Sequence, residues 1–308
     1  MAEKIIEVTN LKKSYGDVQA VKGLNFYVEQ GQLFAFLGPN GAGKSTTIDI
    51  ITTFLKKDSG TVIVDGCSLD SEKYKIRERI GAVFQDNVLD ARLTVYENIV
   101  MRGSLYGLKH KALKEAAENA IRIAEVEDFK NRMYGKLSGG QRRRADIARA
   151  LVHTPKILFL DEPTTGLDPQ TRKSVWQTIR RLQIETGMTV FLTTHYMEEA
   201  AEADYMVIVN HGEIAAKGTP ALLKEQYAAD FLKITPKTAA HDDLVAFLNE
   251  RQYSFREVGG VFKIPVKNSM EALPLLISCQ DKIEGFEVVN GTMDDAFIAI
   301  TGEEKSND

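Results

Sequence analysis

Several features that would assign a protein to a specialised class are scarce in this sequence. Its 308 residues include two cysteines, Cys67 and Cys279, which stand far apart and outside any metal-ligand spacing. We therefore expect two free buried thiols rather than a disulfide or a metal site. The sequence has no uninterrupted run of 18 apolar residues, which argues against a membrane span. The opening MAEKIIEVTN lacks the apolar core of a signal peptide, so we expect the chain to stay in the cytosol.

The charge balance also excludes one class of partner. The 39 Lys and Arg residues are matched by 43 Asp and Glu residues, for a net charge of −4. A chain-wide basic field of the kind that attracts nucleic acid is missing, so no nucleic-acid partner is expected. With 44% apolar and 27% charged residues, the composition is that of a globular protein. Its length suggests about two domains.

The stretch around which the rest is organised is a phosphate-binding loop. It fits the pattern G-x-x-x-x-G-K-[ST] and comprises Gly38, Pro39, Asn40, Gly41, Ala42, Gly43, Lys44, Ser45 and Thr46. An apolar run, residues 33–37, precedes it and predicts a buried strand, while a helix is expected from Ser45 onward. Strand, glycine loop and helix together present backbone N–H groups and a helix N-terminus to a polyphosphate. Lys44 is expected to reach the β- and γ-phosphates, and the Ser45 hydroxyl to bind Mg²⁺. The alternative is a glycine-rich turn with an incidental lysine.

Polar side chains follow two further apolar strands. Asp161 and Glu162 end the run that begins at Ile157, and His195 ends the run that begins at Thr189. Ligands of open α/β sheets sit at the carboxyl ends of the strands. We expect Asp161 to hold the Mg²⁺ shell and Glu162 to orient and deprotonate the attacking water. A lone histidine is usually structural, but the place of His195 at the same edge as Glu162 allows a contact with the γ-phosphate. Adjacent buried carboxylates repel each other without a cation, so a purely structural role for this pair is unfavourable.

Two candidates are ambiguous on position alone. Tyr15 lies in a turn before the phosphate loop, where it could stack on adenine or be an ordinary turn tyrosine. Gln85 is predicted at the end of the strand that begins near Arg79, where its amide could serve the Mg²⁺ shell or a water, or simply cap the strand.

A second anion-binding device is predicted farther along the chain. Ser138, Gly139, Gly140 and Gln141 open an amphipathic helix, and a helix N-terminus attracts anions. The alternative is a Ser-capped helix after a glycine turn. The arginines at 142–144 wind around the helix instead of forming one stripe, which disfavours nucleic acid.

These motifs, in this order, resemble those of the ATP-binding cassette (ABC) family over residues 4–225. The segment LSGGQ before ILFLDEP, followed by TGLDP and TTH, carries most of that resemblance. The resemblance implies that Tyr15 stacks on adenine, and that Gln85 touches Mg²⁺ and couples to the membrane partner. It further implies that Ser138 and Gly140 are signature residues, that Asp168 lies in the loop crossing the dimer interface, and that His195 is the switch histidine. Arg143 stands where many members carry Gln, a departure that we do not expect to alter the chemistry.

The expected fold is therefore α/β, a P-loop NTPase cassette with a mixed core sheet, an antiparallel β subdomain and a helical subdomain at about residues 90–155. Residues 1–227 would form this cassette. Residues 228–308 read as βαββαβ plus a last helix, a small α+β domain of ferredoxin-like type. Its ending, Met293–Gly302, resembles cassettes of the daunorubicin-resistance exporter type.

The resemblance also implies partners. The signature of one copy would face the phosphate loop of another, in a head-to-tail homodimer or cassette pair that binds ATP and Mg²⁺. Two such copies complete two sites. A separate integral membrane permease would carry the substrate, and this subunit would sit at the cytoplasmic face of the membrane. Alternatives are an importer ATPase, a lipid or polysaccharide exporter, a cassette acting on ribosomes or nucleic acid, and a nucleotide binder without hydrolysis.

Overall fold

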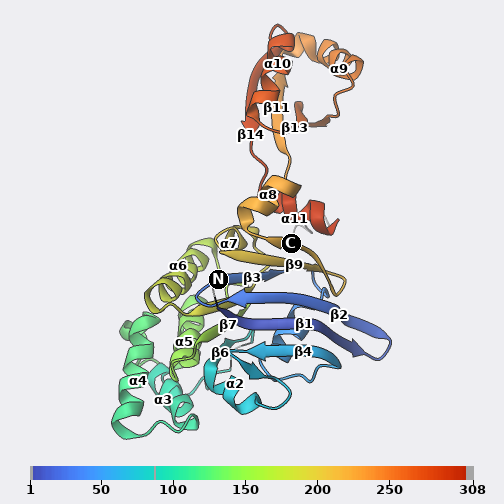
Figure 1. The fold of residues 1–308 in the computed structure, drawn as a ribbon. Coiled ribbons are helices and arrows are strands. Elements are labelled where there is room, and N and C mark those ends of the chain that lie inside the picture. The colour runs from blue at the N-terminus through green and yellow to red at the C-terminus, as the bar shows by residue number, and fades with distance from the viewer. Residues whose placement is uncertain (1–2, 87, 303–308) are drawn as a thin grey trace. The chain divides into compact units, whose positions relative to one another are not determined.

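The computed structural model describes residues 3–86 and 88–302, which divide into two compact units, Met1–Pro220 and Ala221–Asp308 (Figure 1). Each unit has its own hydrophobic core. The boundary between the two units lies at the start of helix α8 (Pro220–Tyr227). From the sequence we expected the domain boundary at the end of this helix, after residue 227.

An antiparallel sheet opens the first unit. Its strands lie in the order β2-β1-β4-β5, and their bounds are β1 Lys4–Tyr15, β2 Val18–Glu29, β4 Ser59–Val64 and β5 Cys67–Ser68. Buried and exposed residues alternate along much of β2, so that Leu24, Phe26 and Val28 enter the core. This is the predicted antiparallel subdomain with one wet face.

The central sheet has six strands in the order β10-β9-β3-β8-β7-β6. Their bounds are β3 Leu33–Leu37, β6 Ile80–Val83, β7 Ile157–Asp161, β8 Thr189–Thr193, β9 Tyr205–Asn210 and β10 Glu213–Gly218. The five strands from β9 to β6 pair in parallel, and β10 pairs antiparallel to β9. The sheet is therefore mixed, as predicted. Strand β6 ends two residues before Gln85, so the expectation that the strand runs to Gln85 was wrong; the carbonyl of Phe84 instead accepts a hydrogen bond from Arg143.

Helices surround the central sheet and form the insert expected near residues 90–155. The insert contains α3 Val95–Leu105, α4 His110–Ile123 and α5 Gly139–Leu151, with 3₁₀ turns at Glu127–Phe129 and Tyr134–Lys136. The other helices of this unit are α1 Lys44–Ile51, α2 Lys73–Arg79, α6 Pro169–Thr186 and α7 Met197–Ala200. Thr94 and Glu97 form a capping box at the start of α3.

The second unit contains a four-stranded sheet in the order β12-β13-β11-β14. Its elements are β11 Asp230–Pro236, α9 His241–Glu250, β12 Arg256–Val258, β13 Val261–Val266, α10 Ser269–Cys279, β14 Ile283–Val289 and α11 Met293–Thr301. Strand β13 lies between β11 and β12, so that the first βαβ segment is split by another strand. The element order is the predicted βαββαβ, and it fits a ferredoxin-like arrangement.

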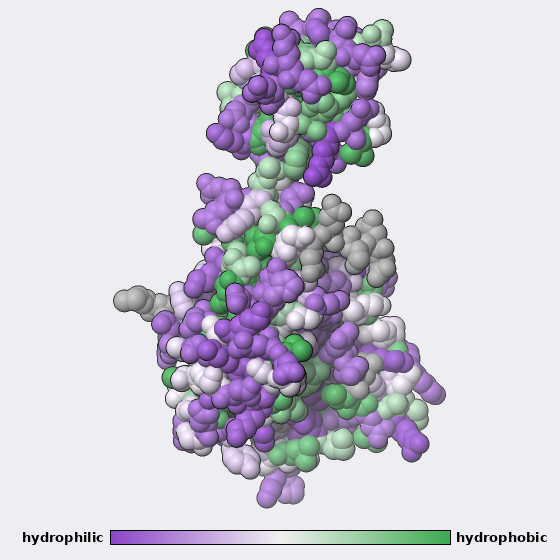
Figure 2. Space-filling view, turned by 90° about the vertical axis from the view of Figure 1, so that its right-hand side faces the viewer, coloured by the Kyte–Doolittle hydropathy of each residue, from purple (hydrophilic) through white to green (hydrophobic). Residues whose placement is uncertain are grey.

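Both thiols are free and buried, Cys67 in the first unit and Cys279 in the second. Over residues 3–86 and 88–302, no helix combines the length and the apolar character that a membrane crossing needs. Figure 2 shows one face of the molecule, on which mainly hydrophilic residues are visible and hydrophobic residues form small groups.

Candidate functional site

Most of the predicted site residues lie at one edge of the central sheet, because the strands that precede them are parallel. Strands β3, β8, β7 and β6 are parallel neighbours in that order, so their carboxyl ends meet at one edge of the sheet. The phosphate loop follows β3, His195 follows β8, Asp161 ends β7 with Glu162 just after it, and Gln85 follows β6. Thr193 stands beside both Phe36 and Asp161 in the strand register. Four segments with predicted site residues therefore leave four adjacent strands on the same side.

The glycines of the phosphate loop are required by close backbone approaches. A Cβ atom on Gly38 would lie 2.2 Å from the carbonyl oxygen of Val209, and one on Gly43 would lie 2.5 Å from that of Ala20. Gly43 also has a φ of 99°, which L side chains rarely adopt. The loop thus holds its curled shape between β9 and β2, with its amides available to a ligand.

Lys44 starts helix α1 and folds back over this loop. Its ammonium donates to the carbonyl oxygens of Gly38 at 2.7 Å and Pro39 at 3.0 Å. The side chain is buried, whereas Ser45 beside it is exposed and Thr46 half-buried. The ammonium of Lys44 is therefore held beside the phosphate loop by these two carbonyl oxygens. In a complex with a polyphosphate, phosphate oxygens would take their place as acceptors.

Asp161 is a partly buried carboxylate at the centre of the edge. Its Oδ1 accepts a hydrogen bond from the Thr193 hydroxyl at 2.6 Å. Burial raises the pKa of Asp161, and the charge of Glu162 adds to that rise, while the Thr193 hydrogen bond, Lys44 and Arg143 lower it. Because burial and the neighbouring Glu162 make the negative charge of Asp161 unfavourable, a cation bound beside this carboxylate would be stabilising.

Glu162 is held in an uncommon backbone conformation with a φ of 47°, which a non-glycine residue adopts only when its surroundings enforce it. Its N–H donates to the Thr193 carbonyl at 3.2 Å and to the Thr193 hydroxyl at 3.0 Å. Its Oε2 accepts from the Thr165 hydroxyl at 3.1 Å and lies 3.5 Å from Nδ1 of His195. The contact with His195 lowers the pKa of Glu162 against the effect of burial. Glu162 is therefore ionised near neutral pH, as a base must be.

A buried glutamate that the sequence analysis did not select joins the segments around this pair. Glu199 in α7 accepts hydrogen bonds from the hydroxyls of Thr164 at 2.5 Å and Thr194 at 2.6 Å. Thr164 follows Glu162 by two residues, and Thr194 precedes His195. Glu199 is buried in the short helix α7, four residues after His195, and this nearness in the sequence was the available signal.

Helix α5, whose start is the predicted second anion-binding segment, is hydrogen-bonded to β6 and to the Gln85 segment. Arg143 and Arg149 of α5, and His153 just after it, donate to alternate carbonyls of β6 and the residue that follows it: His153 to Ile80 at 2.9 Å, Arg149 to Ala82 at 2.7 Å, and Arg143 to Phe84 at 2.7 Å. Strand β6 is the edge of the sheet, so these carbonyls have no neighbouring strand to accept from. Arg143 also reaches the Gln85 carbonyl at 3.4 Å. The Gln85 side chain itself is exposed.

Ser138 caps α5. Its hydroxyl accepts from the N–H of Gln141, and the Gln141 side chain accepts from the N–H of Ser138, which makes a capping box. A Cβ atom on Gly139 would lie 2.9 Å from Leu167, and one on Gly140 would lie 2.2 Å from Thr171. The two glycines thus allow the start of α5 to approach the start of α6. The start of α5 is therefore a Ser-capped helix. Ser138 and Gly139 are also exposed, so the cap does not prevent an anion from approaching this N-terminus.

Asp168 and Tyr15 lie away from the carboxylate centre. Asp168 caps α6 by accepting from the N–H of Thr171 at 3.0 Å, which places it beside the signature segment of its own chain. Tyr15 ends β1 with half of its surface exposed, and the Lys13 ammonium lies 5.7 Å from its ring centre. An exposed ring of this kind is free to stack on a base.

The signature segment and the phosphate loop stand at different places along the edge. Arg143 and Arg149 of α5 bind carbonyls at β6 and just after it, whereas the phosphate loop follows β3, and strands β8 and β7 lie between β6 and β3. Three strand spacings of about 4.8 Å separate β6 from β3 by roughly 14 Å. Because α5 is anchored at β6, we expect Ser138 to lie too far from the loop of its own chain to contact phosphates held there.

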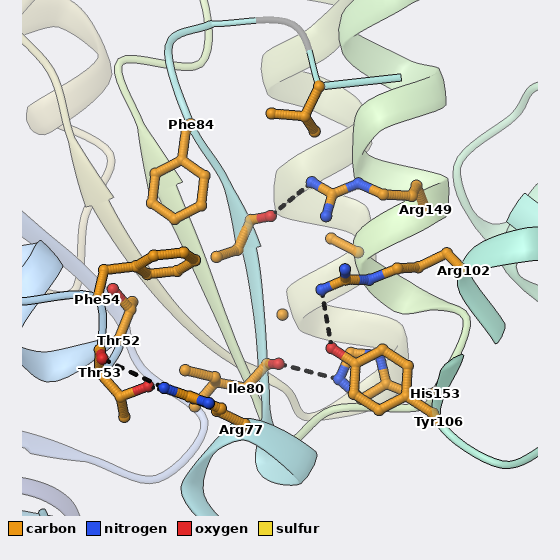
Figure 3. A pocket seen from close by; sticks show the side chains of 14 residues that line it. Thr52, Thr53, Phe54, Arg77, Ile80, Phe84, Arg102, Tyr106, Arg149 and His153 are labelled. Carbon is orange, nitrogen blue, oxygen red and sulfur yellow. Dashed lines mark hydrogen bonds between the residues drawn. The ribbon is translucent and has the colours of Figure 1, made fainter. Parts of the chain in front are cut away.

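A cavity of about 450 Å³ lies between β6, the end of α1 and the helical insert (Figure 3). Phe54 and Phe84 meet edge-to-face at its rim, with ring centres 5.1 Å apart. On the opposite wall, the rings of Tyr106 and His153 stack at 3.8 Å. The cavity thus has aromatic rings on two walls. Phe84, which lines it, directly precedes Gln85.

Comparison with known proteins agrees with this geometry. The family model described as ABC transporter matches residues 21–165. The chain is 37% identical to the daunorubicin/doxorubicin resistance ATP-binding protein DrrA of Streptomyces peucetius, over 97% of this chain and 93% of that protein. It is 38% identical to the Nod factor export ATP-binding protein I of Burkholderia orbicola, over 81% and 83%. Among solved structures, a dimeric ATP-binding cassette in a post-hydrolysis state with ADP and phosphate aligns with a TM-score of 0.63 and 31% identity, over 70% of this chain and 98% of that one.

Proposed function

This chain belongs to the ABC transporter family, and we propose that its ATP sites form head to tail between two copies, which drive export through a separate membrane permease. The chain is an ATPase subunit of an ABC transporter, related to drug-resistance and export ATP-binding proteins. The pairing, the roles of individual residues and the permease are the proposal. The observation that carries it is the anchoring of α5 at β6, three strand positions from β3 and the phosphate loop.

In the proposed mechanism the phosphate loop and Lys44 hold the β- and γ-phosphates. Glu162 accepts a proton from the attacking water, and His195 holds the Glu162 carboxylate in place while its other ring nitrogen faces the γ-phosphate. Contact with His195 keeps Glu162 ionised. Positioning and charge stabilisation supply most of the rate enhancement in phosphoryl transfer.

The donor set fits Mg²⁺. The Ser45 hydroxyl, the Asp161 carboxylate and the Gln85 amide are hard oxygen donors, and the raised pKa of Asp161 marks a place where a cation is favourable. When bound with ATP, the ion would neutralise charge on the phosphates. Asp161, Ser45 and Gln85 are the residues that would hold it.

The other half of each site would come from a second copy. There Ser138 and the amides of Gly139 and Gly140 would face the γ-phosphate, and Asp168 would lie at the interface. A two-fold pair makes two complete sites from two chains. Tyr15 would stack on adenine at the outer end.

The cavity of Figure 3 offers the permease a docking place. Phe54 is 72% exposed at its rim, and Phe84 directly precedes Gln85. An apolar segment of the permease seated there would contact both the end of α1 and the Gln85 segment. Its movement would be transmitted to both ends of the ATP site. The cassette would then lie at the cytoplasmic face of the membrane.

An experiment on the whole transporter tests this proposal. Phe54→Asp should abolish co-purification of the membrane protein while the ATPase activity of the isolated subunit persists. Tyr74→Asp is the matched control, because Tyr74 is at least as exposed, at 80%, and does not line the cavity. Retained co-purification in Phe54→Asp would exclude this docking place. Recovery with ribosomes instead of a membrane protein would support the alternative class.

A further inference from the structure

The ring of Tyr196 packs directly against the imidazole of His195. The two ring centres are 4.1 Å apart, and the ring planes are inclined by 41°. A polar contact also joins the imidazole to Glu162, but its 3.5 Å length exceeds that of a usual N–H···O hydrogen bond. Because 43% of the His195 side chain is exposed, a contact of this length does not by itself fix the orientation of the imidazole. The neighbouring tyrosine ring therefore restricts it further.

The guanidinium of Arg172 lies over the same tyrosine ring. Its central carbon is 3.4 Å from the ring centre of Tyr196, well within the roughly 6 Å over which a cation is attracted to an aromatic face. Within the part of the chain that the structure describes, the buried Nε of Arg172 has no hydrogen-bond partner. Stacking on Tyr196, and not a hydrogen bond from Nε, therefore explains where this guanidinium lies.

The backbones of both residues are fixed by hydrogen bonds. The N–H of Tyr196 donates to the Thr194 hydroxyl at 3.0 Å, and its carbonyl accepts from the N–H of Glu199 at 3.2 Å, at the start of α7. The N–H of Arg172 donates to the Asp168 carbonyl at 2.9 Å, in the first turn of α6. The tyrosine ring is thus set between a helix start on one strand end and a cation from another helix.

We propose that Tyr196 and Arg172 are positioning residues for His195: Arg172 holds the ring of Tyr196, and that ring holds the imidazole beside Glu162. This inference rests on the role proposed above for His195. The phosphate loop and Lys44 are not part of the contact. Its loss should therefore lower kcat and leave the KM for ATP nearly unchanged.

Steady-state hydrolysis by the full-length subunit tests the role of the tyrosine ring. Tyr196→Leu should lower kcat by roughly tenfold, because rate falls steeply when a catalytic group is misplaced. The KM for ATP should stay within about twofold of the wild-type value. Tyr196→Phe keeps the ring and should retain most of kcat. An equal loss in Tyr196→Phe would overturn the ring contact as the cause.

A double-mutant cycle tests whether Arg172 acts through Tyr196. Arg172→Met alone should lower kcat several-fold, whereas Arg172→Lys keeps a cation over the ring and should recover part of the loss. Lys173→Met, at the exposed next residue of α6, is the matched control and should hydrolyse ATP normally. In a Tyr196→Leu chain, Arg172→Met should cause no further loss. Independent effects, which would multiply, would overturn the proposed order of contacts.

Nuclear magnetic resonance tests the ring contact without relying on activity. The Hε1 resonance of His195 is identified by its disappearance in His195→Ala. Tyr196→Leu should shift this resonance, because the aromatic ring beside the imidazole is gone, while Tyr196→Phe should leave it nearly in place. Arg172→Met should shift it in the wild-type chain and not in Tyr196→Leu. A resonance that does not move in Tyr196→Leu would contradict the contact.

The outcomes separate this inference from the proposed role of His195. A low kcat in His195→Ala, together with wild-type kcat in Tyr196→Leu, overturns the positioning and leaves the role of His195 intact. Wild-type kcat in His195→Ala removes that role and, with it, the positioning of a catalytic group.

Discussion

Oε2 of Glu162 lies 3.5 Å from Nδ1 of His195, across the carboxyl ends of two neighbouring strands. Glu162 follows β7 with a left-handed backbone, and Thr193, which binds its N–H, ends β8. The pair is thus built from strand adjacency, and the same contact lowers the pKa of Glu162.

Removing the charge of Glu162 should stop turnover without stopping binding. Glu162→Gln keeps the side-chain shape, so ATP binding should persist while kcat falls by roughly 10²- to 10⁴-fold, the usual contribution of a general base. Steady-state hydrolysis and equilibrium ATP binding measure the two quantities. Glu198→Gln, an exposed neighbour of the site on α7, should hydrolyse ATP normally. A normal kcat in Glu162→Gln would reject its role as base.

The pH profile should depend on His195. In the folded protein the pKa of Glu162 is lowered, first by His195, so the ionised base persists as the pH falls. In His195→Ala the remaining effect of burial raises that pKa. The acid limb of kcat should therefore move to higher pH than in the wild type. An acid limb that does not move, at whatever residual rate, would show that the contact does not set the ionisation.

Arg143 should contribute to both stability and rate. Its guanidinium is buried and binds two carbonyls before and at Gln85. Arg143→Ala should lower the free energy of unfolding by about 2 kcal/mol and lower kcat. Arg143→Lys keeps the charge near Asp146, so it should recover stability more than rate, because an ammonium cannot bind both carbonyls in a fork. Arg92→Ala, at an exposed arginine, should change neither. Wild-type kcat in Arg143→Ala would contradict a positioning role.

His153 should make the fold sensitive to mild acid. Burial lowers the pKa of His153 to about 4, against the hydrogen bond to Ile80. Between an unfolded pKa of about 6.5 and this value, the unfolded chain binds the proton and the folded chain does not. Stability is therefore lost as the pH falls, by about 2 kcal/mol between pH 7.5 and 5. Urea unfolding should show a smaller loss in His153→Gln, whose amide can still donate to Ile80. An equal loss would assign the pH dependence to other groups.

The sequence predicted those parts of the candidate site that follow directly after strands. Apolar runs that end in Asp161-Glu162 and His195 indicated the carboxyl edge of the central sheet, and the glycine pattern indicated the phosphate loop. Both signals depend only on local sequence. The clamp from Arg143 to Phe84 joins residues 59 positions apart, and the bonds from Thr164 and Thr194 to Glu199 need the segments after β7 and β8 and helix α7 in place. Such contacts depend on tertiary packing, which periodicity does not encode. The roles of the individual site residues, including the adenine role of Tyr15 and the cross-chain role of Asp168, stay predictions.

The central claim is that each ATP site takes its phosphate loop from one copy and its signature segment from another. Mixing Lys44→Ala chains with Ser138→Arg chains tests it most directly. Each variant alone should be inactive, while the mixture should recover about a quarter of wild-type hydrolysis, because half of the pairs are mixed and each mixed pair keeps one intact site of two. A mixture as inactive as its components, or full-rate hydrolysis by a monomeric Ser138→Arg chain, would contradict the claim.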